Sequence, residues 1–232
     1  MKNFDDIRFQ DLQEGLYDPN IFKAFFLAGG PGSGKTFVTK GAFGGTGLRV
    51  INSDNAFESA LRKHGLSLKM PEDEAEARDI LRARAKGVTD KTLDLSLKGR
   101  LGLVIDGTGR DYDKIKSQND MLKQLGYDTY MVFVNTSKEV ALERNRMRER
   151  KLGDHMVELM WDAVQQNIGE FQKLFGTDKM IIVDNSSYDN AELLDQIEKE
   201  INKRLKKPVQ NPIGKHWLKA NDPKNRDRNK PA

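Results

Sequence analysis

Residues 29–36 read GGPGSGKT and fit the pattern G-x-x-x-x-G-K-[ST] at every fixed position, directly after the apolar run at 25–28. Glycines let successive backbone N–H groups turn toward the β- and γ-phosphates of a nucleotide, and a lysine adds a positive charge there. A threonine hydroxyl at the start of the following helix can bind Mg²⁺. The stretch therefore predicts a site for ATP and Mg²⁺, with the metal held by Thr36 and the phosphates by Gly30, Pro31, Gly32, Ser33, Gly34, Lys35 and Thr36.

A dinucleotide-binding G-x-G-x-x-G loop is the nearest alternative, because Asp54 lies about 20 residues beyond the glycines, where an acid could hold a ribose. The spacing excludes it. After Gly30 and Gly32 the third glycine would be needed where Lys35 stands. A glycine-rich surface turn is the remaining alternative.

Short apolar runs alternate with helical patterns along the chain, which predicts a parallel sheet covered on both faces. The fold class is therefore α/β, a P-loop kinase-type three-layer sandwich with a mainly parallel sheet of about five strands. Helices are expected from Thr36, after Asp54, and over 111–125, 137–151, 155–175 and 190–205, with a charged surface helix over 72–86. The expected strands are 22–28, 49–52, 101–106, 129–134 and 180–183.

The composition fits one domain with a tail. The chain has 232 residues, 37% of them hydrophobic and 32% charged, and it has no cysteine. This excludes disulfides and cysteine-ligated zinc. No stretch approaches the roughly 20 apolar residues that span a bilayer, so a cytoplasmic protein with no membrane contact is expected. The predicted divisions are an N-terminal extension (1–20), a kinase domain (21–207) and a tail (208–232).

The basic charge of the chain belongs to its C-terminus. The formal net charge is +4, and residues 208–232 alone hold six basic and two acidic side chains. Four of the seven prolines also lie there, which favours a flexible tail. Such a tail could contact nucleic acid weakly through phosphates.

Two aspartates end apolar runs. Ligands of doubly wound sheets bind beyond the carboxyl ends of the strands, so these acids are candidates for chemistry. Asp106 suits the carboxylate that orients Mg²⁺, and Asp54 suits the base that accepts the proton of an attacking hydroxyl. The alternative for each is a helix N-cap.

A basic cluster follows the fourth strand. Residues 144–151 read RNRMRERK, and a Gly-containing break follows at 152–154. Arginines suit the charge that spreads over a phosphoryl group during its transfer. The cluster is interpreted as a lid over ATP, at about 144–154, in which Arg144 and Arg148 share one helix face and Arg146 and Arg150 another. A solvated basic helix is the alternative.

The order of these segments resembles the zeta-toxin family of P-loop kinases. The matching stretches are GGPGSGKT, VINSDNAF, LVIDGTGRDYDKI and EVALERNRMRER, and the DGTGR segment is the most distinctive after the phosphate loop. The resemblance implies phosphorylation of a sugar hydroxyl of UDP-N-acetylglucosamine and a protein antitoxin as partner. It implies catalytic roles for Lys35, Asp54, Arg144 and Arg150, and substrate contacts from Asp90, Thr108 and Arg110. Asp106 departs from the glutamate that the family tends to have.

Polynucleotide 5′-hydroxyl kinases are also similar. They share the phosphate loop, an asparagine and an aspartate after the second strand (here Asn52 and Asp54) and a lid that starts Arg-Asn (here Arg144 and Asn145). The sequence thus predicts an ATP- and Mg²⁺-dependent kinase for a hydroxyl acceptor, either a nucleotide sugar or a nucleic-acid end. An ATP-gated binding protein without turnover is the alternative from another class.

Overall fold

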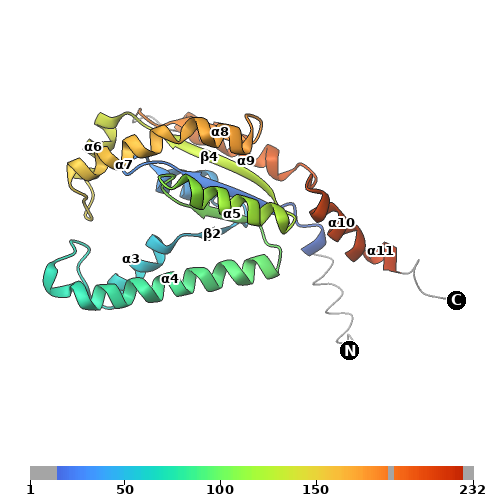
Figure 1. The fold of residues 1–232 in the computed structure, drawn as a ribbon, viewed down its shortest axis with the longest axis horizontal. Helices are drawn as coiled ribbons and strands as arrows, with labels where there is room; N and C mark the ends of the chain where they lie inside the picture. The colour runs from blue at the N-terminus through green and yellow to red at the C-terminus, as the bar shows by residue number, and fades with distance from the viewer. Residues whose placement is uncertain (1–14, 188–190, 227–232) are drawn as a thin grey trace.

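A computed structural model describes residues 15–187 and 191–226 and shows a five-stranded sheet in the order β2-β3-β1-β4-β5. All four strand pairs are parallel, and helices lie on both faces (Figure 1). The predicted α/β kinase-type fold is confirmed. The strands are β1 (Lys23–Ala28), β2 (Arg49–Ile51), β3 (Leu103–Asp106), β4 (Asp128–Asn135) and β5 (Met180–Asp184).

The central strand β1 is buried along its whole length, as expected of a parallel strand covered on both sides. Its side chains alternate between two cores because successive residues of a strand point to opposite faces. Ala24 and Phe26 join the core beneath α5 (Tyr112–Gln124), α7 (Asp154–Gln166) and α8 (Ile168–Phe175). Phe25 and Leu27 join the core beneath α2 (Lys35–Ala42) and α9 (Ala191–Leu205).

A helix pair stands beside these layers with a small core of its own. It consists of α3 (Ser53–Lys63) and α4 (Ala75–Lys98), joined through the 3-10 turn η1 (Glu72–Glu74). Phe57, Leu61, Leu68, Leu81 and Ala85 form that core. The charged segment expected as a surface helix over 72–86 is thus the first part of a longer helix, one face of which packs on α3.

Two helices predicted as continuous end earlier than their patterns suggest. The helix expected over 155–175 breaks at Asn167, whose Nδ2 donates to the carbonyl oxygens of Gly109 and Arg110, both at 2.9 Å. The lid helix α6 (Lys138–Arg146) stops at Arg146, so Arg148 and Arg150 lie on a loop and share no helix face with Arg144. At Asn167 a tertiary contact overrides the local helical pattern.

The interpretation of residues 208–232 as a flexible tail is wrong for the part that the structure describes. Residues 212–221 form α10 (Pro212–Asn221), followed by α11 (Pro223–Arg226), while 227–232 lie outside the described residues. The Asp128 carboxylate accepts from the backbone N–H groups of Gln210 and Asn211, both at 2.8 Å. Trp217 packs edge-on against Phe22, with ring centroids 5.5 Å apart. Buried partners at the amino ends of β1 and β4 therefore order this segment.

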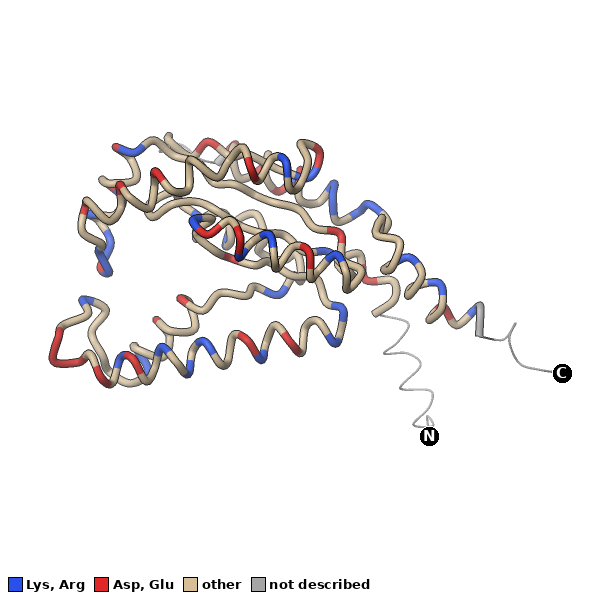
Figure 2. Tube along the Cα trace, viewed as in Figure 1, with Lys and Arg blue, Asp and Glu red and all other residues tan. Residues whose placement is uncertain are grey.

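Figure 2 shows the basic residues of α10 and α11 at the end of the molecule away from the lid loop. Of the predicted N-terminal extension, residues 1–14 lie outside the described residues. Its last residue, Asn20, is buried and donates from Nδ2 to the carbonyl oxygen of Thr46 at 2.6 Å. Within the described ranges, none of the helices combines the length and the apolar character needed to cross a membrane.

Candidate active site

The phosphate loop connects the end of β1 to α2. Gly32 and Gly34 have positive φ angles of 76° and 91°, which side-chain-bearing residues rarely adopt. Close neighbours also exclude a side chain, because a Cβ at Gly32 would lie 2.3 Å from the carbonyl oxygen of Ala141 and one at Gly34 would lie 2.1 Å from Asn185 Nδ2. The fold therefore requires glycine at both of these positions.

Lys35 begins α2 and turns back over the loop. Its Nζ donates to the carbonyl oxygens of Gly29 at 2.5 Å and Gly30 at 3.3 Å. Burial lowers the pKa of Lys35 to about 8, while the negative charges of Asp106 and Asp54 raise it and the positive charge of Arg148 lowers it. Four charged side chains from different parts of the chain thus act at one place.

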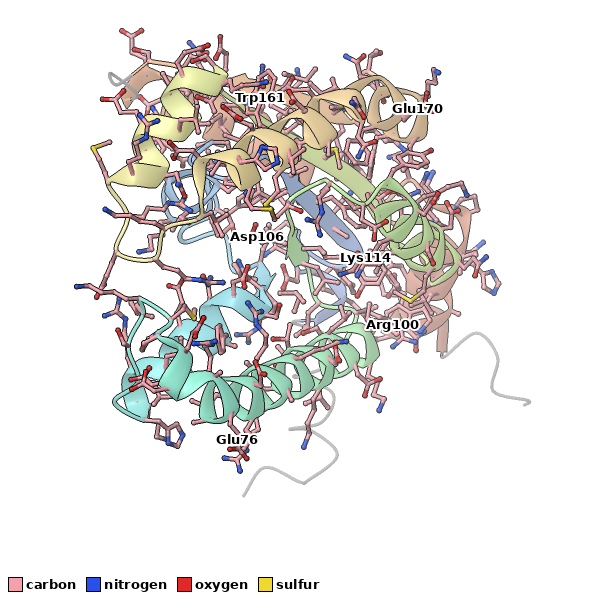
Figure 3. The ribbon with its side chains drawn as sticks, turned by 60° about the vertical axis from the view of Figure 1, so that its left-hand side comes forward. Glu76, Arg100, Asp106, Lys114, Trp161 and Glu170 are labelled. Atoms are coloured by element: carbon pink, nitrogen blue, oxygen red, sulfur yellow. The ribbon has the colours of Figure 1, made fainter. Side chains whose placement is uncertain are left out.

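Asp106 ends β3 and lies next to the phosphate loop; Figure 3 labels it near the centre of the molecule. Asn52, at the end of the neighbouring β2, donates from Nδ2 to Asp106 Oδ2 at 2.5 Å. Burial raises the pKa of the Asp106 carboxyl, and the charge of Lys35 and the Asn52 hydrogen bond oppose that effect. The N-cap alternative does not apply to Asp106, because Asp111 caps α5.

Asp54 lies in the first turn of α3, and the residue that caps this helix is Asn52. The Asn52 Oδ1 accepts from the backbone N–H groups of Asp54 at 2.8 Å and Asn55 at 3.2 Å. The Asp54 carboxylate is therefore not needed as a cap, and its side chain is 58% exposed. Arg82 of α4 and Arg150 of the lid loop approach it at 3.5 and 3.9 Å.

The DGTGR segment is fixed against the start of the phosphate loop. Gly107 N–H donates to Leu27 O at 2.9 Å, and Gly29 N–H donates to Thr108 O at 3.0 Å. Gly109 has a φ of 78°, and a Cβ there would lie 2.8 Å from that of Ala28. Arg110 is exposed just beyond this turn. Thr108 and Arg110 thus follow Asp106 at the same edge of the sheet as the phosphate loop.

The lid helix carries Arg144 to the other side of the loop. Its guanidinium donates to the carbonyl oxygens of Asn185 at 2.8 Å and Ser187 at 3.0 Å. Asn185 in turn donates from Nδ2 to Ser33 O at 2.7 Å. These bonds place Arg144 beside Gly34. No sequence pattern points to Asn185, because its role depends on a contact between residues 152 positions apart.

The other lid arginines have different surroundings. Arg150 contacts Glu58 at 3.3 Å, and Arg146 pairs with Asp154 at 2.6 Å on the surface. Arg148 is the lid arginine whose charge lowers the pKa of Lys35. The loop that carries them is closed by Asn145, which donates to Leu152 O at 2.8 Å and accepts from Leu152 N at 3.1 Å.

Asp90, the predicted substrate contact on the helix before β3, is exposed on α4. No hydrogen bond or ion pair joins Asp90 to the other predicted site residues within the described ranges. Those ranges also contain no cluster of three or more His, Asp or Glu side chains that could hold a metal. A P-loop site does not need one, because Mg²⁺ keeps several waters and is bound through phosphates with only one or two protein ligands. The cradle of Gly32 and Gly34, the Lys35 ammonium and the partly buried Asp106 fit ATP with Mg²⁺.

Known structures share this fold at low identity. A presumed kinase of Chloroflexus aurantiacus is 16% identical, with a TM-score of 0.56 over 79% of this chain and 98% of that one. AvrRxo1-ORF1 in its complex with AvrRxo1-ORF2 is 15% identical, with a TM-score of 0.52 over 94% and 81% of the two chains. The PezAT toxin-antitoxin structure of Streptococcus pneumoniae is 18% identical, with a TM-score of 0.49 over 88% and 98%.

The first two structures, with TM-scores above 0.5, show a common fold and no more. No protein of curated function matches the sequence. A family model described as an AAA domain matches residues 25–173, which run from β1 through the phosphate loop, Asp54, Asp106 and the lid into α8. The chain therefore belongs to this AAA domain family.

Proposed function

We propose that this protein is an ATP- and Mg²⁺-dependent kinase that transfers the γ-phosphoryl group to a hydroxyl. The observation that carries the proposal is that Asn52 joins Asp106 and Asp54 beside the phosphate loop, since it donates to the Asp106 carboxylate and accepts from the Asp54 N–H. Phosphoryl transfer requires a cation that binds the phosphates, an acid that orients the metal and a base, all at the same end of the strands. A protein that only binds ATP needs no base.

Each side chain then has a distinct task. Lys35 and the loop N–H groups hold the β- and γ-phosphates, and Arg144, Arg148 and Arg150 are the lid arginines that would neutralise charge on the phosphoryl group. Mg²⁺, when bound, would neutralise phosphate charge, and Thr36 and Asp106 are the residues that would hold it. Asp54 accepts the hydroxyl proton while the acceptor oxygen bonds to the γ-phosphorus and the bond from that phosphorus to the bridging oxygen of ADP breaks.

The preferred acceptor is UDP-N-acetylglucosamine, with Thr108 and Arg110 as its contacts and Asp90 as a weaker candidate. The motivating feature is the DGTGR segment, whose turn follows Asp106 and pairs with the phosphate loop. The same resemblance motivates a protein antitoxin as partner. For the alternative, a 5′-hydroxyl polynucleotide kinase, the basic C-terminal segment is the motivating feature, but it packs at the amino ends of the strands, away from Asp106.

The test is transfer of label from γ-labelled ATP to UDP-N-acetylglucosamine or to a 5′-hydroxyl oligonucleotide. We expect label on the sugar nucleotide and at least ~10²-fold less turnover in Asp54→Asn, the usual scale for a general base. ATP binding should persist in Asp54→Asn and be lost in Lys35→Ala. Full turnover in the Asp54→Asn variant would exclude Asp54 as the base, and ATP binding without any transfer would favour the nucleotide-gated binding protein.

A further inference from the structure

An aromatic ring holds an arginine beside the proposed base. Phe57 is buried in the core between α3 and α4, and the Arg82 guanidinium carbon lies 4.4 Å from its ring centroid. The guanidinium carbon of Arg150 lies 5.7 Å from the same centroid. Stacking on an aromatic face restricts a guanidinium while its N–H groups point outward in the ring plane, and this arrangement suits bidentate binding of phosphate or carboxylate. The two arginines come from α4 and from the lid loop.

Both guanidiniums face Asp54 without forming a close pair with it. The distance to Asp54 Oδ1 is 3.5 Å from Arg82 and 3.9 Å from Arg150, whereas charge-assisted hydrogen bonds are about 2.7–2.9 Å long. Arg150 has a second acidic neighbour in Glu58 at 3.3 Å. Apart from its stacking on Phe57, Arg82 has the long contact to Asp54 and makes no hydrogen bond to the rest of the described chain.

A guanidinium has five N–H donors, so Arg82 keeps most of its donors for a ligand. Its side chain is 48% exposed and that of Arg150 is 26% exposed. A ligand can therefore reach the pair without any change of fold. We propose that Arg82, stacked on Phe57 and assisted by Arg150, binds a negatively charged group of the acceptor beside the hydroxyl that Asp54 deprotonates.

The proposal rests on the function proposed above and assigns the residues that would bind the charged group of the acceptor. An acceptor hydroxyl at Asp54 places the rest of the acceptor against α3 and α4, which lie side by side (Figure 1). A phosphate or carboxylate of the acceptor at this position would accept hydrogen bonds from the Arg82 guanidinium. Its negative charge would also weaken the attraction of both arginines to Asp54. Neutral sugars lack such a group, so the site should discriminate against them.

Arg84 is a matched control, because it is an exposed arginine of the same helix with no contact to the site within the described chain. The first test is independent of turnover. With the phosphate loop saturated by Mg²⁺ and a non-hydrolysable ATP analogue, inorganic phosphate and malonate are titrated separately while the side-chain Nε–H signals of Arg82 and Arg84 are followed by NMR. Alanine variants assign the two signals.

We expect a saturable shift of the Arg82 signal and none of the Arg84 signal. The anion with the lower apparent Kd identifies phosphate or carboxylate as the preferred group. Equal responses of the two arginines, or no response, would overturn the proposal. Saturation at Arg82 in a protein that phosphorylates no acceptor would leave the anion site standing and remove the kinase assignment.

The second test compares UDP-N-acetylglucosamine with N-acetylglucosamine, which lacks the diphosphate. Arg82→Ala should lower kcat/KM for the charged acceptor at least tenfold and leave the KM for ATP within twofold, while Arg84→Ala changes neither. Arg82→Lys keeps the charge but loses the planar fork, so an intermediate loss is expected. Equal kcat/KM in Arg82→Ala and Arg84→Ala, with transfer intact, would overturn the anion site alone.

Discussion

At the scale of single residues, Lys35 links nucleotide binding to pH. Burial lowers its pKa to about 8, so near pH 9 most molecules without nucleotide have a neutral Lys35. Bound phosphates favour the charged form and raise the pKa. Binding of ATP near pH 9 should therefore take up a proton, and affinity should fall as pH rises above about 8, by at most about tenfold per pH unit.

Calorimetry in two buffers of different ionisation enthalpy measures that uptake. The Lys35→Arg variant stays charged at every accessible pH and should show none, whereas Lys40→Ala, a change at an exposed lysine of the same helix, should behave as the unmodified protein does. Proton uptake that is the same in Lys35→Arg would assign it to another group.

Asn52 serves two neighbours at once, since it caps α3 through Oδ1 and donates to Asp106 through Nδ2. Aspartate caps a helix as well as asparagine does, so Asn52→Asp should keep the cap and lose only the donor. It also places a second carboxylate against Asp106, and two adjacent carboxylates raise the pKa of the pair. When the folded state raises the pKa of a carboxyl, the free energy of unfolding falls as pH rises through that pKa.

The Asn52→Asp variant should therefore be more destabilised at pH 7 than at pH 4.5, as measured by urea unfolding at the two pH values. Asn52→Ala loses the cap at both, at a cost of about 1 kcal/mol. A deficit for Asn52→Asp that does not change with pH would show that Asp106 and residue 52 do not share a proton.

At the scale of elements, the lid loop is held closed by the buried side chain of Asn145, whose two hydrogen bonds both go to the backbone of Leu152. Asn145→Ala removes both bonds, and a hydrogen bond of this kind contributes about 0.5–1.5 kcal/mol to stability. We expect trypsin to cut at Arg146, Arg148 or Arg150 several times faster in this variant. Asn202→Ala, at a half-buried position of α9, is the control, because it removes only an exposed hydrogen bond to Glu198. Unchanged cleavage would show that the loop keeps its shape by other contacts.

Sequence patterns predict the strands of this fold better than the ends of its helices. The five strands and the phosphate loop were predictable, because apolar runs and glycines determine them locally. The helix break at Asn167 was not predictable, since a helical pattern does not reveal that the Asn167 side chain donates to the carbonyl oxygens of Gly109 and Arg110. The placement of all the lid arginines on one helix was wrong for the same reason, because α6 ends at Arg146 and the loop after it depends on Asn145.

At the scale of the whole molecule, the candidate site and the C-terminal segment occupy opposite edges of one sheet. Asp106 ends β3, whereas Asp128 begins β4 and binds residues 210 and 211. Composition predicted a flexible tail because it cannot show that Trp217 packs against Phe22 and the Arg100 guanidinium, whose carbon lies 4.4 Å from the indole ring centroid.

Trp217→Ala should lower the free energy of unfolding by about 2–3 kcal/mol, less than for a fully buried aromatic. Thermal unfolding compared with His216→Ala, an exposed neighbour, measures this.

A substitution at Asp128 tests whether the amino ends of the strands affect stability without affecting activity. Its carboxylate pairs with buried Lys23 at 2.9 Å, and removing one partner of a buried pair costs about 3–5 kcal/mol. Burial lowers the pKa of Lys23, and Asp128 opposes that effect, so Asp128→Asn should lower the pKa further. When the folded-state pKa of a lysine lies below 10.5, the free energy of unfolding rises with pH between the folded-state pKa and 10.5. The deficit of Asp128→Asn should thus shrink between pH 7 and pH 9.5 in urea unfolding, while the KM for ATP stays within twofold. A deficit constant with pH would mean that Lys23 stays charged, and a changed KM would mean that the two edges are coupled.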